Sequence, residues 1–416
     1  MPGYMANFSS EILPCFAVLP ENRAFSFGEF TRRGKYPIIR KKIAANENLP
    51  QGSGSYMKKI LIVTNHSYML YRFRRELIQQ LMQTHEVVLC MPFVGHEDDF
   101  QAMGLRCIET AIERRGTNPV TDFKLLKTYK AILKQEKPDL VVTYSIKPNI
   151  YCGMACEQLH IPYCVNVQGL GTAFQKKGIA QMVSVLYRMA LKKAKVVFFE
   201  NQGNADYFTE HHIIRPEKVK LLNGAGINLE DFPLVPYPQN DKLHFLYLGR
   251  IMREKGIDEL FSAIRRLHDE LGDRVVLDLV GFFEDDYQGK IDELTAQGIA
   301  VFHGFQSEPR PYYAAADCVV LPSYHEGLSN VLLESAATGR PVITSSIHGC
   351  LEAVEDGKSG LLCTVRDADS LYEQMRRFAS MSRQEREAMG LAGRAYMEEK
   401  FDKKIVVKET TASILK

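Results

Sequence analysis

The sequence lacks an excess of either charge and lacks any long hydrophobic run. Its 416 residues carry 52 Lys and Arg against 50 Asp and Glu, a formal net charge of +2. A dedicated nucleic-acid-binding protein usually has a strong basic excess, so the near-balance argues against that class. No apolar stretch approaches the roughly 20 residues of a membrane-spanning helix, so none is expected. With 45% apolar residues the chain can form a core, and its length suggests two domains.

The nine cysteines form no framework of metal-binding or disulfide motifs. There is no Cys-x-x-Cys pair, and no set of Cys and His has zinc-finger spacing. Most cysteines stand in apolar runs, as in Leu89-Cys90 and Leu362-Cys363. They are predicted to be small core residues in a reducing cytosol, and neither a metal ion nor a cofactor is expected.

The near-neutral total hides an asymmetry along the chain. Residues 57–238 carry 23 basic and 17 acidic side chains, whereas residues 239–416 carry 22 and 29. The two segments therefore have net charges of +6 and −7. Either the difference has no functional meaning, or the basic half meets an anionic partner or an anionic membrane.

The first 56 residues show no sustained hydrophobic periodicity. They contain a basic stretch over 32–42 and a linker-like Gly/Ser stretch over 51–55, without the order of a signal peptide. Met57 is followed directly by an apolar run that is typical of the opening strand of a parallel sheet. We predict that 1–56 is a disordered extension and that Met57 is a candidate for the true start of the protein.

From Met57 onward, apolar runs alternate with amphipathic segments. Near-continuous apolar strands alternating with helices predict a parallel sheet covered on both faces. The expected strands are 60–64, 86–91, 139–144, 163–167 and 195–200, and the expected helices are 71–83, 122–136, 150–159 and 179–193.

Three prolines within 231–241 exclude a helix or a central strand, so we expect the interdomain linker there. The alternation then restarts, which predicts a second domain. The expected strands are 243–249, 275–281, 299–304, 318–323, 341–346 and 360–364, and the helices are 256–271, 286–297, 309–315, 328–338, 367–379 and 383–399.

The fold class is therefore α/β, with two doubly wound, Rossmann-like domains over 57–235 and 240–395 that face a cleft. The C-terminal segment 396–416 is expected to be a helix that packs back on the first domain. Such sheets bind ligands at the carboxyl ends of their strands, and a cleft between two of them is the usual place for a small-molecule site.

The strongest local signal lies in the polar loop after the expected strand 318–323. Gly327 would let backbone approach a ligand closely, and the amides of 327–330 at the following helix start suit an anion. Glu326 and Glu334 stand roughly 9–12 Å apart along this helix, about the span from sugar to ribose in a nucleotide sugar. The alternative is a helix-start Glu326 favoured by the helix dipole and a solvated Glu334.

A second signal lies at the end of the expected strand 243–249. This strand would deliver Arg250 to the carboxyl edge of the sheet, with Lys255 just before the next helix. Arg grips phosphate oxygens bidentately and Lys supplies a compact charge, so the two cations could neutralise a diphosphate leaving group without metal. The alternative is two solvated cations, although cations at a helix start are mildly unfavourable.

Arg250 and Lys255, together with Glu326 and Glu334 with seven residues between them, resemble the donor half of a retaining glycosyltransferase of family 4, which has the GT-B fold. The resemblance covers about 57–416. Further matching pieces are Gly304-Phe305, Ala316-Asp317, the segment Gly349–Val354 and the segment Asp356–Leu362.

The resemblance implies roles for the matching residues. Arg250 and Lys255 resemble the pair that binds the donor diphosphate. Glu326 resembles the acid at the sugar 3-hydroxyl and the reacting face, and Glu334 resembles the ribose binder.

The rest of the donor site is implied in the same way. The backbone near His303 and Phe305 resembles the part that reads the base, usually uracil. Gly327 and the amides of Leu328 and Ser329 resemble the phosphate cradle. Members of this family retain the anomeric configuration and need no metal.

The first domain departs from the family pattern. Its loop over 64–74 has no glycine where many members have Gly-Gly, and Gln168 stands where many have His. A glutamine can hydrogen-bond but cannot act as a base. This variant resembles a branch acting on polyprenyl-diphosphate-linked sugars in capsule, O-antigen and glycan assembly, including galactosaminyltransferases that extend bacillosamine carriers.

Five residues of the first domain are candidates for acceptor binding. Gln168 and Gly169 belong to a glycine-rich loop that resembles the branch's loop facing the reacting sugar. Arg72, Arg75 and Lys147 are candidates for the acceptor phosphate, with ordinary surface charge as the alternative.

The segment 176–195 contains six basic residues and no acidic one: Lys176, Lys177, Arg188, Lys192, Lys193 and Lys195. Its apolar residues have helical spacing. The segment is either a core-packing helix with a solvated basic edge, or an edge that rests on anionic lipid. A lipid-linked acceptor would make such docking useful. The expected location is therefore cytoplasmic, peripheral at the inner face of the cytoplasmic membrane.

The sequence therefore predicts a hexosyltransferase that moves a sugar from a UDP-sugar to a lipid-linked glycan, with retention and without metal or cofactor. Its expected partners are a nucleotide sugar, a polyprenyl-diphosphate-linked acceptor and an anionic membrane surface, but no nucleic acid. Two alternatives stay open: a nucleotide-sugar epimerase of the same architecture, and a non-catalytic protein that binds sugar nucleotides. The donor sugar and the acceptor are not specified.

Overall fold

The computed structural model describes residues 57–112, 118–171, 174 and 177–416, apart from the side chain of Lys177. The predicted extension over 1–56 and Lys176 of the basic segment lie outside the described residues.

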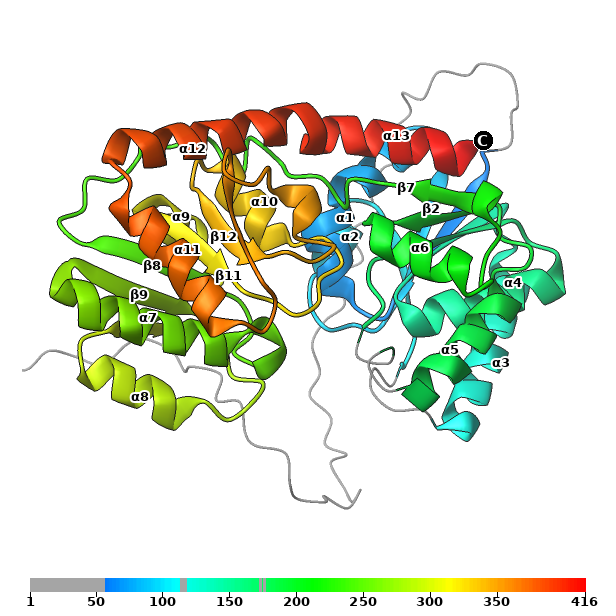
Figure 1. Ribbon diagram of the computed structural model, residues 1–416. Coiled ribbons are helices and arrows are strands. Elements are labelled where there is room, and N and C mark those ends of the chain that lie inside the picture. The colour runs from blue at the N-terminus through cyan, green and yellow to red at the C-terminus, as the bar shows by residue number, and fades with distance from the viewer. Residues whose placement is uncertain (1–56, 113–117, 172–173, 175–176) are drawn as a thin grey trace, which may run out of the picture. The chain divides into compact units, whose positions relative to one another are not determined.

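Seven parallel strands form the sheet of the first domain, in the order β3-β2-β1-β4-β5-β6-β7 (Figure 1). The strand order reverses between β1 and β4, and such a switch point is where ligands bind in open α/β sheets. The strands are β1 (Lys59–Val63), β2 (Glu86–Met91), β3 (Arg106–Glu109), β4 (Leu140–Tyr144), β5 (Tyr163–Val167), β6 (Val196–Phe199) and β7 (Val219–Leu221).

Helices cover both faces of this sheet. They are α1 (Ser67–Met82), α2 (Glu97–Ala102), α3 (Pro119–Glu136), η1 (Pro148–Cys152), α4 (Gly153–Leu159), α5 (Lys177–Ala190), α6 (Gln202–Glu210) and η3 (Pro216–Lys218). Successive strand residues point to opposite faces. Ile60 and Ile62 of β1 therefore pack with α1 and α2, whereas Leu61 and Val63 pack in the core formed with α3, α4 and α5.

Six parallel strands form the sheet of the second domain, in the order β10-β9-β8-β11-β12-β13. Its switch point lies between β8 and β11. The strands are β8 (Leu243–Leu248), β9 (Val275–Val280), β10 (Ala300–Gly304), β11 (Cys318–Leu321), β12 (Val342–Ser345) and β13 (Gly360–Cys363).

The helices of the second domain share one continuous core with this sheet. They are η4 (Arg253–Lys255), α7 (Ile257–Leu271), η5 (Gly272–Arg274), α8 (Gln288–Ala296), α9 (Arg310–Ala315), α10 (Asn330–Ala337), η6 (Leu351–Ala353), α11 (Ala368–Ser380), α12 (Arg383–Tyr396), η7 (Met397–Phe401) and α13 (Lys403–Leu415). The prediction of two doubly wound, Rossmann-like domains is confirmed.

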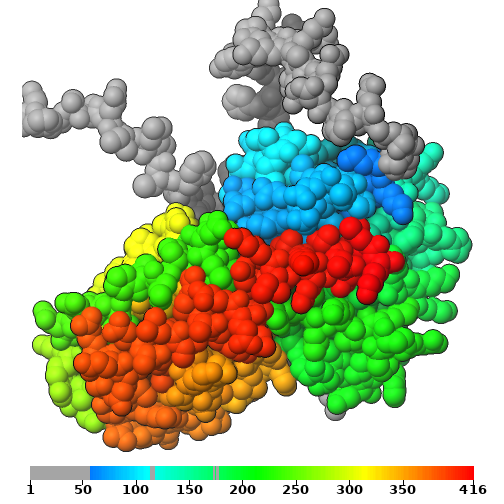
Figure 2. All heavy atoms as spheres, turned by 90° about the horizontal axis from the view of Figure 1, so that it is seen from above, coloured from blue at the N-terminus to red at the C-terminus, as the bar shows by residue number. Residues whose placement is uncertain are grey.

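The last helix, α13, belongs to the second domain by sequence but packs against α1 of the first. Its residue Ile414 lies in the first domain's core, and Lys403 Nζ lies 3.6 Å from Glu76 of α1. Figure 2 shows the red C-terminal helices running from the orange part of the second domain onto the first domain.

Two strands and two α-helices of the described residues were not predicted from the sequence. Strand β3 begins and ends on charged residues, and β7 has only three residues at the sheet edge, so neither has the apolar run of a buried strand. Helices α2 and α6 are only six and nine residues long. Helix α1 begins at Ser67, four residues before its expected start at 71, because the Ser67 and Leu70 side chains are already buried in its first turn.

Within the described ranges, no helix is both long enough and apolar enough to cross a membrane.

Candidate active site

A pocket of about 580 Å³ lies at the switch point of the first sheet and reaches the second domain. Residues after β1 and after β4 line it, and the second domain contributes one cation from the end of β8. The lining consists of Asn65, His66, Tyr68, Met69, Phe73, Ser145, Ile146, Lys147 and Arg250. The structure therefore brings predicted cations of both domains, Lys147 and Arg250, to one cavity.

Lys255 and Glu326 form an ion pair at the switch point of the second sheet. Lys255 Nζ donates to Glu326 Oε1 at 2.6 Å, and Ser323 Oγ donates to the same oxygen at 2.7 Å. Gly256 has a φ of +72°, and a Cβ there would lie 2.1 Å from the Pro322 carbonyl oxygen. Only glycine therefore lets the Lys255 turn lie so close to the 322–326 loop. Because both side chains are largely shielded from solvent, this pair is stronger than a surface salt bridge.

Arg250 is held at the carboxyl end of β8. The Tyr247 hydroxyl donates to the Arg250 carbonyl oxygen at 2.6 Å and fixes the backbone there. The Arg250 guanidinium pairs with Glu284 at 2.7 Å but is 47% exposed. An exposed pair is weak, so Arg250 can exchange Glu284 for a phosphate at little cost.

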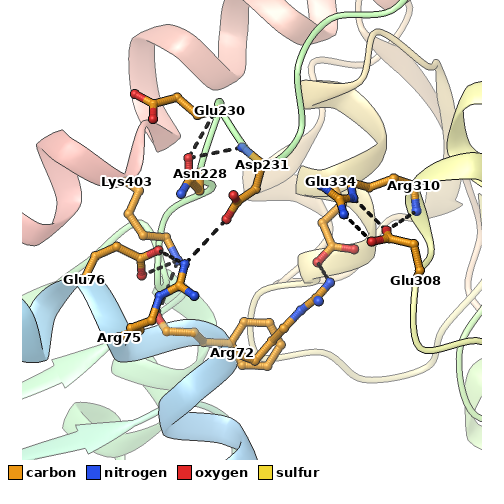
Figure 3. A network of polar contacts seen from close by, with 11 residues as sticks. Arg72, Arg75, Glu76, Asn228, Glu230, Asp231, Glu308, Arg310, Glu334 and Lys403 are labelled. Atoms are coloured by element: carbon orange, nitrogen blue, oxygen red, sulfur yellow. Dashed lines mark hydrogen bonds and ion pairs between the residues drawn. The ribbon is translucent and has the colours of Figure 1, made fainter. Parts of the chain in front are cut away.

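Glu334 lies buried on helix α10, contrary to the alternative that it is solvated. Its Oε2 accepts from the Tyr313 hydroxyl at 2.9 Å, and its Oε1 lies 3.3 Å from Arg72 Nη2 of the first domain. Burial raises the pKa of the Glu334 carboxyl above its usual value, while Arg72 and the Tyr313 hydrogen bond oppose that rise. Figure 3 shows Arg72 pointing at this carboxylate.

One of the backbone amides predicted to form the phosphate cradle is hydrogen-bonded within the chain in this structure. Helix α10 begins at Asn330, two residues later than expected, and the Ser329 amide donates to the Gly349 carbonyl oxygen at 3.0 Å. Ser329 N–H is therefore already engaged. The Leu328 amide has no hydrogen-bond partner among the residues that the structure describes.

The segment around His303 and Phe305, expected to contact the base, is held by hydrogen bonds within the second domain. The His303 ring lies 2.7 Å from Asp278, and its carbonyl oxygen accepts from Gln306 Nε2 at 2.7 Å. That carbonyl, one part of the backbone predicted to face the base, thus already has a donor. Phe305 is 65% exposed. Its ring lies edge-on to that of Phe282, which follows the neighbouring strand β9.

The backbone of Gly327 packs closely against the first domain. A Cβ on Gly327 would lie 1.8 Å from the Gln168 carbonyl oxygen, and a Cβ on Gly169 would lie 3.5 Å from Gly327 Cα. Asn201 at the end of β6 donates its side-chain amide to the Gly327 carbonyl oxygen. The sequence predicted that Gly327 leaves room for a ligand, but in this structure the neighbour is the chain's own backbone.

The three cations proposed for the acceptor phosphate lie in different places. Lys147 lines the 580 Å³ pocket and pairs with Asp122 at 2.9 Å. Arg72 and Arg75 line a separate pocket of about 230 Å³, where Arg72 pairs with Glu334. Arg75 faces Asp231 at 3.8 Å (Figure 3). Arg72 therefore lies beside Glu334, the acid expected to bind the ribose of the donor. It lies in a different pocket from Lys147.

A largely buried ion pair near Gly327 was not predicted from the sequence. Arg74 Nη2 lies 2.6 Å from Glu200 Oε1, and Arg74 Nη1 donates to the Gly224 carbonyl oxygen at 3.1 Å. The other Glu200 oxygen, Oε2, would lie 3.5 Å from a Cβ on Gly327. Because 126 residues separate the two partners, no local motif could have revealed the pair.

Among the described residues, no three His, Cys, Asp or Glu side chains are grouped as ligands of a metal ion.

The chain matches two family models, one in each domain. Residues 59–201 match a model described as glycosyl transferase 4-like, and residues 242–381 match one described as glycosyl transferases group 1. The chain is therefore a glycosyltransferase of this two-domain, GT-B type. The comparisons give the epimerase alternative no support.

Two curated relatives extend over most of the chain. A Campylobacter jejuni N,N'-diacetylbacillosaminyl-diphospho-undecaprenol alpha-1,3-N-acetylgalactosaminyltransferase is 25% identical over 325 residues, 74% of this chain and 85% of the relative. The capsular polysaccharide biosynthesis glycosyltransferase CapM of Staphylococcus aureus is 25% identical over 311 residues, 69% and 81% of the two chains.

The solved structure of Anabaena HepE in complex with UDP and glucose has the same fold. It superposes with a TM-score of 0.71 at 17% identity, over 86% of this chain and 99% of HepE.

Proposed function

We propose that this glycosyltransferase moves a sugar from a UDP-sugar to a polyprenyl-diphosphate-linked glycan during cell-surface polysaccharide synthesis. The observation that carries the proposal is the Lys255–Glu326 pair, with Arg250 beside it opening onto a pocket of the first domain. Catalytic domains over 57–235 and 240–395, with 396–416 as the returning helix, are part of this proposal.

The donor would bind along the carboxyl edge of the second sheet. Arg250 and Lys255 would neutralise the diphosphate, Glu326 would accept hydrogen bonds from sugar hydroxyls, and Glu334 would accept from the ribose. The Gly327 and Leu328 amides and the backbone near Phe305 complete the proposed contacts. The complex of HepE with UDP and glucose supports a UDP-sugar donor by analogy of fold.

Transfer with retention would need no protein base. The bond from the sugar C1 to the leaving phosphate oxygen breaks, and the acceptor oxygen bonds to C1 on the same face. The departing UDP oxygen takes the acceptor proton, while Arg250 and Lys255 stabilise the charge that develops on it without a metal ion. Gln168 and Gly169 face this region and can position groups by hydrogen bonding, but neither can act as a base.

The acceptor would enter the 580 Å³ pocket of the first domain. Lys147 is the cation there that suits a carrier phosphate. The two relatives support this class of acceptor, since one is named for a sugar-diphospho-undecaprenol substrate and the other for capsular polysaccharide biosynthesis. A lipid-linked acceptor implies a peripheral position at the inner face of the cytoplasmic membrane, with the basic segment of α5 toward anionic lipid.

The proposal is tested with purified protein, a panel of UDP-sugars and synthetic polyprenyl-diphosphate sugars. We expect one UDP-sugar to raise the melting temperature and to be transferred, in the presence of EDTA, with an axial product linkage detected by NMR from an α-linked donor. Conversion of the UDP-sugar without an acceptor would instead establish an isomerase. An inverted product or loss of activity in EDTA would refute the corresponding part of the mechanism.

A further inference from the structure

The ring of Tyr68 lies exposed in the wall of the 580 Å³ pocket. Tyr68 stands in the first turn of α1 and is 43% exposed, although the side chains of Ser67 and Leu70 in the same turn are buried. An aromatic ring in a cavity wall offers a large apolar face, and it loses little conformational entropy when a ligand packs on it. The exposure of this ring within a cavity therefore marks it as a contact for a ligand.

A second loop braces the Tyr68 ring. His96, between β2 and α2, has its ring centre 5.5 Å from that of Tyr68, and the His66 ring lies edge-on to Tyr68 at 6.2 Å. His96 is itself fixed, because it stacks on Tyr71 at 4.1 Å and its Nδ1 lies 2.7 Å from Asp99. The Tyr68 ring is therefore held in place before a ligand arrives, which lowers the entropy cost of binding.

Polar groups that can bind a ligand line the same pocket. The Asn65 side-chain amide and the Ser145 hydroxyl have no hydrogen-bond partner among the residues that the structure describes. Lys147 and Arg250 add positive charge to the lining. The pocket therefore combines an aromatic face, two available hydrogen-bonding groups and two cations, and its volume lies within the range of about 300–1,000 Å³ for small-molecule sites.

This combination suits a pyranose ring better than the other parts of the two substrates. A pyranose has a face of C–H groups, which matches the negative face of an aromatic ring, and hydroxyls around its edge that hydrogen-bond. A prenyl chain would bury Asn65 and Ser145 without partners, which costs free energy. The base of the donor is expected near Phe305 of the second domain. An acceptor sugar is therefore the occupant that fits the Tyr68 wall.

We propose that Tyr68, braced by His96, is a platform on which a pyranose of the acceptor glycan stacks while Asn65 and Ser145 bind its hydroxyls. Lys147 would hold the carrier phosphate in the same cavity. The ring binds and orients the sugar and takes no part in the bond changes. This inference rests on the proposed acceptor class.

The test measures what a sugar adds to the affinity for a carrier. Calorimetry with the full chain compares geranyl diphosphate with geranyl diphosphate linked to glucose, galactose, N-acetylglucosamine or N-acetylgalactosamine. UDP is present so that the donor site is filled. We expect at least one sugar-linked compound to bind the wild type about tenfold more tightly than geranyl diphosphate, since an aromatic contact contributes on this order.

Variants of the platform assign that gain to the ring. Tyr68→Leu keeps an apolar side chain but removes the aromatic face, so it should abolish most of the gain and leave the affinity for geranyl diphosphate unchanged. Tyr68→Phe should keep the gain. His96→Leu removes the brace and should reduce the gain about threefold, which tests the platform independently of any change at Tyr68. The matched control is Phe123→Leu, which removes a 57% exposed ring on α3 and should leave the gain unchanged.

The possible failures separate this inference from the proposed function. A wild type that binds geranyl diphosphate but gains nothing from any of the four sugars would overturn the platform alone. The platform would also be wrong if Tyr68→Leu weakened geranyl diphosphate as much as its sugar derivatives, because Tyr68 would then contact the carrier. A wild type that binds none of these compounds would contradict the acceptor class itself, and the platform with it.

Discussion

The two domains share one architecture, but a group of surface cations on the first domain differs from the site cations of the second in having no carboxylate partner within the described ranges. In the acidic second domain, Arg250 and Lys255 each contact a carboxylate, at 2.7 and 2.6 Å. In the basic first domain, Arg188, Lys192 and Lys193 have no carboxylate partner among the described residues. Cations held inside a site by carboxylates are poised to exchange them for ligand phosphates. Cations left open on a surface are suited to a partner outside the molecule.

The domains also differ at their switch points. The second domain places glycine at positions 249, 256, 327 and 349, whereas the loop over 64–74 of the first has none. Close packing between the domains uses glycines of both, since a Cβ on Gly203 or Gly224 of the first domain would lie 2.3 or 2.5 Å from His348 or Leu328. The loop over 64–74 instead contributes long side chains, Arg72 and Arg74. This asymmetry is consistent with a donor site in the second domain that the first domain closes.

The largest effect should come from removing the central cation of the second domain. Lys255→Ala deletes the charge proposed to stabilise the leaving diphosphate, so kcat should fall about 10²–10³-fold. Turnover with saturating donor and acceptor measures this. Lys358→Ala, which removes an exposed lysine paired with Glu355, is the matched control and should keep full activity. Comparable activity in both variants would remove Lys255 from the mechanism.

The contact between the domains is tested by Gly327→Ala. The added Cβ would lie 1.8 Å from the Gln168 carbonyl oxygen, so the two loops must separate. We expect kcat to fall about 10–100-fold, because misplacing a reacting centre by about 1 Å costs on this order. The melting temperature should change little, since each domain's own core is untouched. Gly289→Ala, where a Cβ meets nothing within 4 Å, is the control. Normal turnover in Gly327→Ala would show that this approach of the domains is not required.

A smaller, pH-dependent effect is expected for Arg72→Met. Burial already raises the pKa of Glu334, and losing the Arg72 charge should raise it further. Since the proposed ribose contact needs the ionised carboxylate, UDP should bind about tenfold more weakly at pH 6 than at pH 8 in the variant, beyond any such change in the wild type. Calorimetry at both pH values checks this.

The comparison for this variant is Arg75→Met, because Arg75 pairs with Glu76 and Asp231 instead of Glu334. An identical pH dependence of UDP binding in both variants would argue against Arg72 as the residue that tunes Glu334.

The smallest effect concerns the stability of the second sheet. Asp278 bridges the rings of His244 and His303 at 2.7 Å each. The hydrogen bond to Asp278 raises the pKa of His244, and burial opposes this rise. Burial acts to raise the pKa of Asp278, but its bonds to the two histidines lower it overall. The ion pair between His244 and Asp278 therefore stabilises the fold most between about pH 4 and 6.5. Its contribution is lost as pH rises through the His244 pKa.

Asp278→Asn should lower the melting temperature by about 2–4 °C at pH 5.5, with a smaller difference at pH 8.5. Thermal unfolding at the two pH values measures this. Asp273→Asn, which alters an exposed pair with His268, should show no such pH dependence. A constant difference across the pH range would contradict the assignment to His244 titration.

The sequence was most informative where structure is set locally. Every predicted apolar run became a strand, and most of these strands are buried, because a parallel strand covered on both faces must be apolar along its length. Strand β4, all five residues of which are buried, is an example. The short edge strands β3 and β7 were missed because partial exposure removes this pattern.

By itself, the sequence determined the alternation of strands and helices, the linker prolines and the residue types around Glu326 and Arg250. Tertiary structure alone decided which charges meet: Lys255 with Glu326 across 71 residues, Arg74 with Glu200 across 126, and Arg72 with Glu334 across 262. It also decided that Ser329 gives its amide to Gly349. Strand and helix patterns repeat within a few residues, whereas these contacts depend on how two sheets and their loops come together in space.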